Sequence, residues 1–550
     1  MAGGMTLDPN GIATQAIFSP SMIEQVVYSC GTIDKAPEGV CKHRLWNLAS
    51  SSARGLVEIF SISEMVRQEG CELSSKFHLE KHGACNVQIC QLNDENTTKV
   101  PQLHLLCKSQ NCGTINFSQA KLNKIDIAEI SKPGATAWTL NEKDPQPGAK
   151  NYLAISHVWA NGTGELGCEG IWWDAISIPS DKDKRVKAIQ NMHDNYKKAK
   201  HTVVFDLELA DFKWTGDGHS CLALALSTWF SRGWTALELR SSESVKVVFK
   251  NPNGGRRVLK DLDSKIVQPS MHLYAHPGWK SVAEHIRWLR RNQSNFNRPS
   301  EYPDFGVFPG SIAFTVTPIE SQRSDFTIDS LLSILEPRYT CWARDRIIIA
   351  ALLVGTNSKT PDQTWFDPEQ PCADISRKIL IKIGSISYHS IFHDEVPIFE
   401  SGPWSWCPPS LFGFGSRAYS PGSVYSVGAF LSVGTDGHLY GNWNVFELPD
   451  DAADRLRPHA SHPHLKSRIM VALREHTNFY LLSARESRQI SKYLLAKATE
   501  QYTNDQKSKC WQGAGGYSPP PAKVFQYVGI VIGQLPPDAE CIAHGQNCRL

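Results

Sequence analysis

The sequence lacks both an excess of charge and a long hydrophobic segment. Its formal net charge is only +2, which gives no general attraction to nucleic acid or to an anionic membrane. The longest apolar run, Ile347 to Val354, is far shorter than the roughly 20 residues that a membrane-spanning helix needs. The N-terminal stretch MAGGMTLDPNG has no basic segment followed by an apolar one, so we expect no signal peptide. We therefore expect a cytoplasmic protein with neither nucleic acid nor a membrane as its partner.

The sequence also lacks the short motifs of several common enzyme classes. It contains no H-E-x-x-H, no G-x-S-x-G and no Walker-type phosphate loop, so zinc-protease, serine-hydrolase and Walker-type chemistry have no support. GTGELG (162–167) does match the G-x-G-x-x-G pattern. In dinucleotide-binding folds, however, a helix begins at these glycines and its N-terminus meets the pyrophosphate. Here another predicted strand follows at 170, so we interpret the stretch as a glycine-bearing loop at the end of a strand.

Cysteine, by contrast, is not scarce, since the chain has 15. Without a secretory signal we expect reduced thiols rather than disulfides. Thiolate and imidazole ligands could close a tetrahedral zinc site in the N-terminal region. We do not favour zinc there, because the Cys-x4-Cys spacing is looser than in zinc ribbons and buried cysteines are common. The residues concerned are His78, His82, Cys85, Cys90, His104, Cys107 and Cys112.

The length of the chain, 550 residues, is too great for one hydrophobic core and indicates roughly three domains. The turn-rich stretch NEKDPQPGAK (141–150) indicates the first boundary. We expect an N-terminal Cys/His-rich domain over 1–148, an α/β domain with a helical extension over 149–356, and an α+β, β-rich domain over 357–550.

The most regular pattern lies between residues 151 and 250. Short apolar strands alternate there with helical patterns, which favours a mainly parallel sheet covered on both faces. The expected strands are NYLAIS (151–156), GIWWDAISIP (170–179), HTVVFD (201–206) and VKVVF (245–249). The expected helices are 183–200 and 221–239, the second with a break at Gly233.

Beyond residue 250 the periodicity is weaker. VAEHIRWLRRN (282–292) predicts a basic amphipathic helix, and 327–355 predicts two more helices. After about 360, strand and turn patterns dominate, as in 423–443 and in KVFQYVGIVIG (523–533).

Three blocks of the chain resemble the signature blocks of the fungal heterokaryon-incompatibility (HET) domain. They are NYLAISHVWANGTG, IWWDAISIPSDKDKRVKAIQNMHDNYKKAKHTVVFD and WFSRGWTALEL. RDRIIIAALLVG (344–355) is similar to a later segment of the family, so the resemblance extends more loosely to about 356. The chain departs from the family's pattern at His157, Ala160 and Leu237, where Tyr, Gly and Gln are frequent. The first 148 residues and the last third are not covered.

The HET domain is in turn remotely similar to the TIR domain, which implies a flavodoxin-like, mainly parallel core. Some TIR domains hydrolyse NAD through a glutamate on a helix, and SRGWTALEL aligns with that helix, with Trp234 and Glu238 in place. The resemblance implies that Glu238 is catalytic and lies beside an aromatic ring because both line a pocket. A carboxylate there would stabilise the oxocarbenium-like cation that forms when the nicotinamide–ribose bond breaks.

Ligands of open α/β sheets bind outside the carboxyl ends of the strands. The loops after NYLAIS and GIWWDAIS leave from such ends, so we expect the walls of a nucleotide site to include Ser156, His157, Trp159, Asp174 and Trp234. A structural role is the alternative for several of them. Trp234 and Glu238 could simply anchor their helix, and Asp174 could be a buried hydrogen-bonding acid within a strand.

Three hypotheses for function stay open at this point. The first is an enzyme acting on NAD in non-self recognition and cell death. The second is a non-catalytic module that signals by self-association or by binding an incompatibility partner protein. The third is an enzyme of specialised metabolism that uses the same pocket for another small molecule. Fold alone does not choose among them.

Overall fold

The computed structural model describes the following residues: 41, 43–44, 117–139, 145–157, 170–271, 277–290, 327–335, 338–340, 342–355, 365–388, 390–414, 430–475, 478–483, 491–498, 523–536, 539 and 541–550. Trp159 and the Cys and His residues between 78 and 112 lie outside these ranges. Their roles in a nucleotide site and in a zinc site therefore stay predictions.

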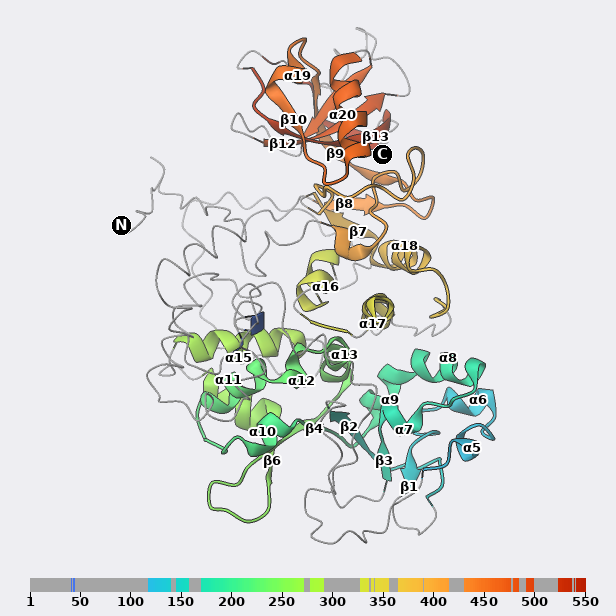
Figure 1. Ribbon diagram of the computed structural model, residues 1–550, viewed down its shortest axis with the longest axis vertical. Coiled ribbons are helices and arrows are strands. Elements are labelled where there is room, and N and C mark those ends of the chain that lie inside the picture. Colours follow the sequence, from blue (N-terminus) through green and yellow to red (C-terminus); the bar gives the residue numbers. More distant parts are fainter. Residues whose placement is uncertain are drawn as a thin grey trace, which may run out of the picture.

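The first sheet has six strands, and its four central strands run parallel. Its order is β1 (Trp138–Thr139), β3 (Gly170–Trp172), β2 (Leu153–His157), β4 (His201–Phe205), β5 (Val245–Phe249) and β6 (Val258–Asp261). The edge strands β1 and β6 pair antiparallel with their neighbours, whereas the other pairs are parallel. The parallel α/β core expected for 151–250 is confirmed (Figure 1). Because β1 precedes residue 148, the sheet begins before the boundary expected there.

Helices fill the connections between these strands. Before β1 lie α5 (Gln119–Leu122) and α6 (Ile127–Ile130), and after β3 lie α7 (Asp174–Ser177), α8 (Lys182–Gln190) and α9 (Met192–Lys198). Between β4 and β5 lie α10 (Leu207–Asp211), α11 (His219–Leu226), α12 (Thr228–Ser231) and α13 (Gly233–Ser241). A π-helix (Leu262–Val267), α14 (Gln268–Ser270) and α15 (Pro277–Arg290) follow β6. All residues of β4 except the first are buried, as expected for a parallel strand covered on both faces.

One expected strand is wrong in its second half. GIWWDAISIP forms a strand only as far as Trp172, and Asp174 opens the helix α7 instead of lying in the middle of a strand. Two local hydrogen bonds compete with the sheet ladder at this point. The Asp174 carboxylate accepts the amide of Ala175, and the Ser177 hydroxyl accepts the amide of Trp173.

The two long helices expected in this region are each divided. The helix expected over 183–200 is two helices, α8 and α9, with Asn191 between them. The helix expected over 221–239 is three, and the predicted break at Gly233 is confirmed, because α13 begins there.

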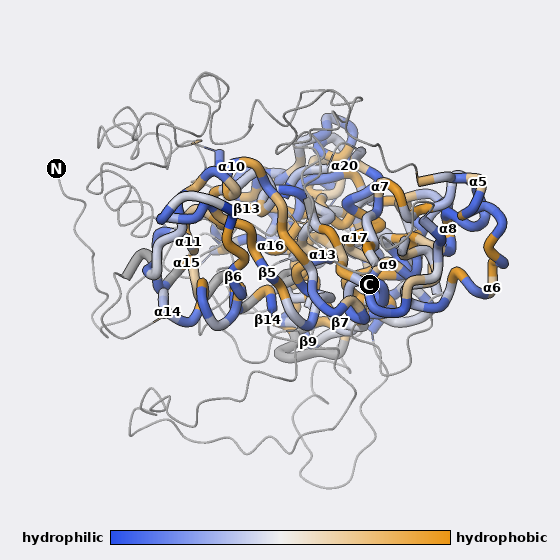
Figure 2. Tube along the Cα trace, turned by 90° about the horizontal axis from the view of Figure 1, so that it is seen from below, coloured by the Kyte–Doolittle hydropathy of each residue, from blue (hydrophilic) through white to orange (hydrophobic). Residues whose placement is uncertain are grey.

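Two apolar helices join the first sheet to the rest of the chain. α16 (Ile328–Leu335) contacts α13 and β7, and α17 (Ala343–Gly355) packs between α13 and α18 (Cys372–Ile383). Every residue of α17 from Ile347 to Val354 is buried, and both helices carry long hydrophobic stretches (Figure 2). One hydrophobic cluster consequently extends from Ala137 to Leu550. In the part of the chain that the structure describes, no helix has the length and apolar character needed to cross a bilayer.

The second sheet confirms the β-rich pattern of the last third. Its strands are β7 (Ser385–Ser387), β8 (Phe430–Val433), β9 (Leu439–Glu447), β10 (Leu456–Pro458), β11 (Phe479–Ser483), β12 (Ser491–Ala498), β13 (Lys523–Gly533) and β14 (Cys541–Arg549). β14 pairs with both β13 and β9, which closes a circuit of strands through β12 and β11. α20 (Pro463–Glu475) packs its apolar face on β13, and α19 (Ala452–Arg455) lies beside it.

Candidate functional site

A buried acid lies against the carboxyl end of β2. Glu238, on α13, has only 5% of its surface exposed, and Ser156, near the end of β2, has none. The Ser156 hydroxyl donates a hydrogen bond to the Glu238 carboxyl, and the indole N–H of Trp229 donates one to the same hydroxyl. Three residues from β2, α12 and α13 therefore form one continuous hydrogen-bonded chain.

The position of Glu238 depends on how closely α13 approaches its neighbours. Its first residue, Gly233, lies so near the segment 338–340 that an added Cβ would be 2.5 Å from Thr340 Cγ2. The Gly233 amide donates to the carbonyl of Tyr339 at 2.6 Å, and the Tyr339 amide donates to the carbonyl of Ser231 at 2.7 Å. The chain reversal between α12 and α13 is held from outside by this segment.

Burial dominates the electrostatics of Glu238. Removal from water, and then the nearby Asp174 carboxylate, raise the pKa of Glu238 to about 7. The Ser156 hydrogen bond, the charge of Arg232 and the Tyr196 hydroxyl act in the opposite direction. Glu238 can therefore exchange between its neutral and charged forms close to neutral pH.

Two further groups face Glu238 from α9 and from the segment 338–340. Burial, followed by the charges of Glu238 and Asp174, raises the pKa of Tyr196 well above its usual value. The Tyr196 hydroxyl approaches Glu238 but makes no hydrogen bond of standard geometry. Burial lowers the pKa of Arg338 to about 9, and the Glu238 charge opposes that change. The Arg338 guanidinium also donates to the Arg232 carbonyl at 3.2 Å and to Thr235 Oγ1 at 3.1 Å.

Of the predicted wall residues, Ser156 contacts Glu238 and Asp174 lies near it, whereas the Trp234 indole bonds to a different acid. The Trp234 indole donates to the carboxylate of Asp345, on α17, at 3.0 Å. Trp229, five residues earlier, is the tryptophan that hydrogen bonds connect to Glu238 through Ser156. A place for Trp234 in the wall of the pocket stays a prediction. His157 ends β2 and pairs with Phe205 of β4.

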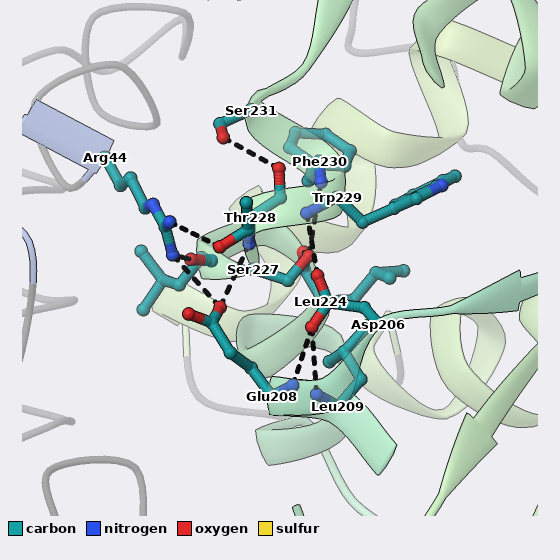
Figure 3. Close-up of polar contacts among 11 residues, drawn as sticks. Arg44, Asp206, Glu208, Leu209, Leu224, Ser227, Thr228, Trp229, Phe230 and Ser231 are labelled. Carbon is teal, nitrogen blue, oxygen red and sulfur yellow. Dashed lines mark hydrogen bonds and ion pairs between the residues drawn. The ribbon is translucent and has the colours of Figure 1, made fainter. Parts of the chain in front are cut away.

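A second buried acid, which sequence reasoning missed, lies at the carboxyl end of the neighbouring strand. Asp206 follows β4 and is fully buried. It accepts the amides of Glu208 (2.8 Å) and Leu209 (3.2 Å) at the start of α10, and the amide of Trp229 (2.8 Å) at the start of α12 (Figure 3). Burial, and then the neighbouring Glu208, raise the pKa of Asp206 to about 7. The signal in the sequence was an acid directly after the apolar run HTVVF.

The chemistry of this site is that of carboxyl and hydroxyl groups. Among the residues that the structure describes, no group of three or more His, Cys, Asp or Glu side chains could hold a metal ion. Of the cysteines in the described ranges, Cys221, Cys372 and Cys407 are free thiols. What the site offers a ligand is a carboxyl group that can become negatively charged near pH 7, in surroundings poor in water.

Comparison with protein-family models, with curated proteins and with solved structures gave no significant match to this chain.

Proposed function

We propose that this chain is a HET-type protein with a TIR-like core that hydrolyses NAD to nicotinamide and ADP-ribose, with Glu238 as the catalytic carboxylate. The observation that carries the proposal is the buried Glu238 carboxyl at the carboxyl end of a parallel strand, with its pKa raised to about 7. Buried acids with perturbed pKa values are concentrated at functional sites, because leaving a charge without water is otherwise unfavourable.

The strand order supports a ligand site at this place. Across the sheet, the four parallel strands lie in the order β3, β2, β4, β5. Numbered by their place along the chain, this order is 2-1-3-4. This is the beginning of the flavodoxin-like order, in which ligands bind where the order reverses, between the first and third strands. Those strands are β2 and β4, and near their carboxyl ends lie Ser156 and Asp206.

The proposed reaction needs one negative charge and one water molecule. As the bond between nicotinamide and ribose breaks, its electron pair leaves with nicotinamide, and positive charge develops on the ribose. The Glu238 carboxylate stabilises this charge, and its effect is larger in a buried site than in water. Water then adds to the anomeric carbon and releases a proton, which the carboxylate can accept. Ser156 and Trp229 hold the carboxyl in place during these steps.

Nicotinamide release by the purified full-length protein tests this proposal. We expect Glu238→Gln to lower the rate by about 10²–10³-fold, because it keeps the size of the side chain and removes its charge. The matched control is Glu447→Gln, an exposed glutamate of β9, which should leave the rate unchanged. The wild-type kcat/KM should rise as the pH increases through about 7, because only the charged form of Glu238 stabilises the cation.

Two results would contradict the proposal in different ways. Full activity of Glu238→Gln removes this residue from the mechanism. No nicotinamide release by the wild-type protein rejects NAD hydrolysis itself and leaves the assembly module or another small-molecule substrate.

A further inference from the structure

Arg44 is a buried cation whose partners among the described residues lie far along the chain. Only 5% of its surface is exposed, and each of its described hydrogen bonds spans at least 164 residues. One guanidinium nitrogen, Nη1, donates to the Glu208 carboxylate at 3.1 Å and to the Leu226 carbonyl at 2.8 Å. The other, Nη2, donates to Thr228 Oγ1 at 2.6 Å. Figure 3 shows the guanidinium reaching from its short helical stretch to α10 and α12.

One of the residues that Arg44 contacts, Glu208, also holds the start of α12. A helix begins with amides that have no partner within the helix, and in α12 side chains accept the first three. Glu208 accepts the amide of Thr228 (3.1 Å), Asp206 that of Trp229 (2.8 Å) and Ser227 that of Phe230 (3.2 Å). Arg44 binds one of these acceptors, Glu208, and also the side chain of Thr228, the first residue of α12.

The same helix carries the hydrogen-bond donor that reaches the candidate site. The backbone amide of Trp229 is held by Asp206, and its indole N–H holds Ser156, which donates to Glu238. A displacement of the start of α12 would therefore move the group that orients the Glu238 carboxyl.

We propose that Arg44 is a positioning residue for Glu238, which acts by fixing the start of α12 and, through Trp229 and Ser156, the orientation of the carboxyl. The effect of Arg44 on catalysis rests on the proposed NAD hydrolysis, whereas its hydrogen-bonded connection to Glu238 through α12 does not. The charges are arranged to match this role. Asp206 and Glu208 lie side by side, and the Arg44 charge counteracts the rise in the pKa of Asp206. Without Arg44, two neighbouring acids would be left with one cation fewer, which is unfavourable at a buried position.

Hydrogen exchange of the full-length protein tests the connection without any substrate. We expect Arg44→Ala to speed amide exchange in peptides covering 227–241 by about tenfold or more, because their opening becomes easier. Peptides of the second sheet should exchange at the wild-type rate. Arg44→Lys keeps the charge but not the two-nitrogen fork, so it should give an intermediate rate and provides a second variant if Arg44→Ala does not fold.

The matched control is Arg468→Ala. Arg468 also binds a backbone carbonyl, that of Val528 at 2.6 Å, but on the second sheet. Its replacement should speed exchange in peptides of α20 and β13 and leave 227–241 unchanged. Unchanged exchange over 227–241 in both Arg44 variants overturns the proposal.

The pH profile of nicotinamide release separates positioning from a loss of stability. The Ser156 hydrogen bond lowers the pKa of Glu238, so its weakening in Arg44→Ala should move the rise in kcat to higher pH. A loss of folded protein would lower the rate equally at every pH, and that result overturns the positioning role. If the wild-type protein does not cleave NAD, the proposed function fails, while the exchange measurement still decides whether Arg44 holds α12.

Discussion

The two sheets of this protein differ in what they bury. Around the first sheet, the fully or almost fully buried side chains include two acids and three arginines: Arg44, Asp206, Glu238, Arg290 and Arg338. Beyond residue 338, the buried polar side chains of the described residues are serines and one histidine, His393. Burial lowers the pKa of His393 and so favours its neutral form. Beyond residue 338, none of the buried side chains among the described residues is an acid, a lysine or an arginine.

The difference shows which sheet buries charged side chains, an unfavourable arrangement that hydrophobic packing alone does not require. An apolar core of similar volume is often as stable as one that contains buried charges. The second sheet follows that simpler solution. The first sheet keeps Asp206 and Glu238 at the carboxyl ends of its strands, with pKa values of about 7. The contrast supports a functional site at the first sheet, and the following predictions test it.

The largest expected effect on stability concerns the pH dependence that Glu238 imposes. Its pKa is about 7 in the folded protein against 4.5 for the free side chain. The folded state therefore binds the proton more tightly, and the stability gained below pH 4.5 is lost as the pH rises through 7. The difference between these two pKa values corresponds to roughly 3 kcal/mol in the free energy of unfolding. We expect Glu238→Gln, which cannot titrate, to gain about this much relative to wild type between pH 4 and pH 8.

Urea denaturation at a series of pH values measures this difference. Glu447→Gln, an exposed change on the second sheet, is measured over the same pH series as the control. A Glu238→Gln variant whose relative stability is independent of pH would show that Glu238 is not held in a raised-pKa environment. Glu238 would then no longer support the contrast between the two sheets.

A smaller effect is expected at Asp206. Asp206→Ala leaves the amides of Glu208, Leu209 and Trp229 without their carboxylate acceptor. We expect the free energy of unfolding to fall by about 2–3 kcal/mol, because a helix cap and a buried hydrogen bond are removed together. The matched change on the second sheet is Asp451→Ala. Asp451 also precedes a helix, α19, but is exposed and its side chain caps no amide.

Thermal melting of the two Asp variants compares the sheets directly. Asp451→Ala should melt within a degree or two of wild type, since exposed positions contribute little. Equal destabilisation of the two variants would mean that the buried position of Asp206 has no special role.

The sequence predicted the elements better than the contacts between them. Apolar runs such as HTVVF and VKVVF are sufficient to identify buried parallel strands, because both faces of such strands are covered. The strand expected at GIWWDAISIP ended early, because Asp174 and Ser177 hydrogen-bond to nearby amides in ways that periodicity does not show.

The contacts of the site were harder to predict, because its members are far apart in sequence. Ser156 and Glu238 are 82 residues apart, and Arg44 and Glu208 are 164 apart. The spacing of four residues suggested Trp234 as the neighbour of Glu238. The hydrogen bonds instead connect Glu238 through Ser156 to Trp229. Trp229 lies on α12 and Glu238 on α13, so helical spacing could not indicate this contact.

The smallest expected effect concerns Gly233, where the first sheet meets the segment 338–340. In Gly233→Ala the new Cβ would be 2.5 Å from Thr340 Cγ2 and 3.1 Å from Ile349 Cδ1. Such crowding costs about 1–3 kcal/mol, although alanine's higher helix propensity returns up to about 1 kcal/mol. We expect a net loss of about 1 kcal/mol, measured by urea denaturation. Gly216→Ala is the control, because its Cβ would meet nothing within 4 Å. If Gly233→Ala is as stable as Gly216→Ala, then the segment 338–340 does not constrain the start of α13, and Glu238 owes its position to Ser156 and Trp229 alone.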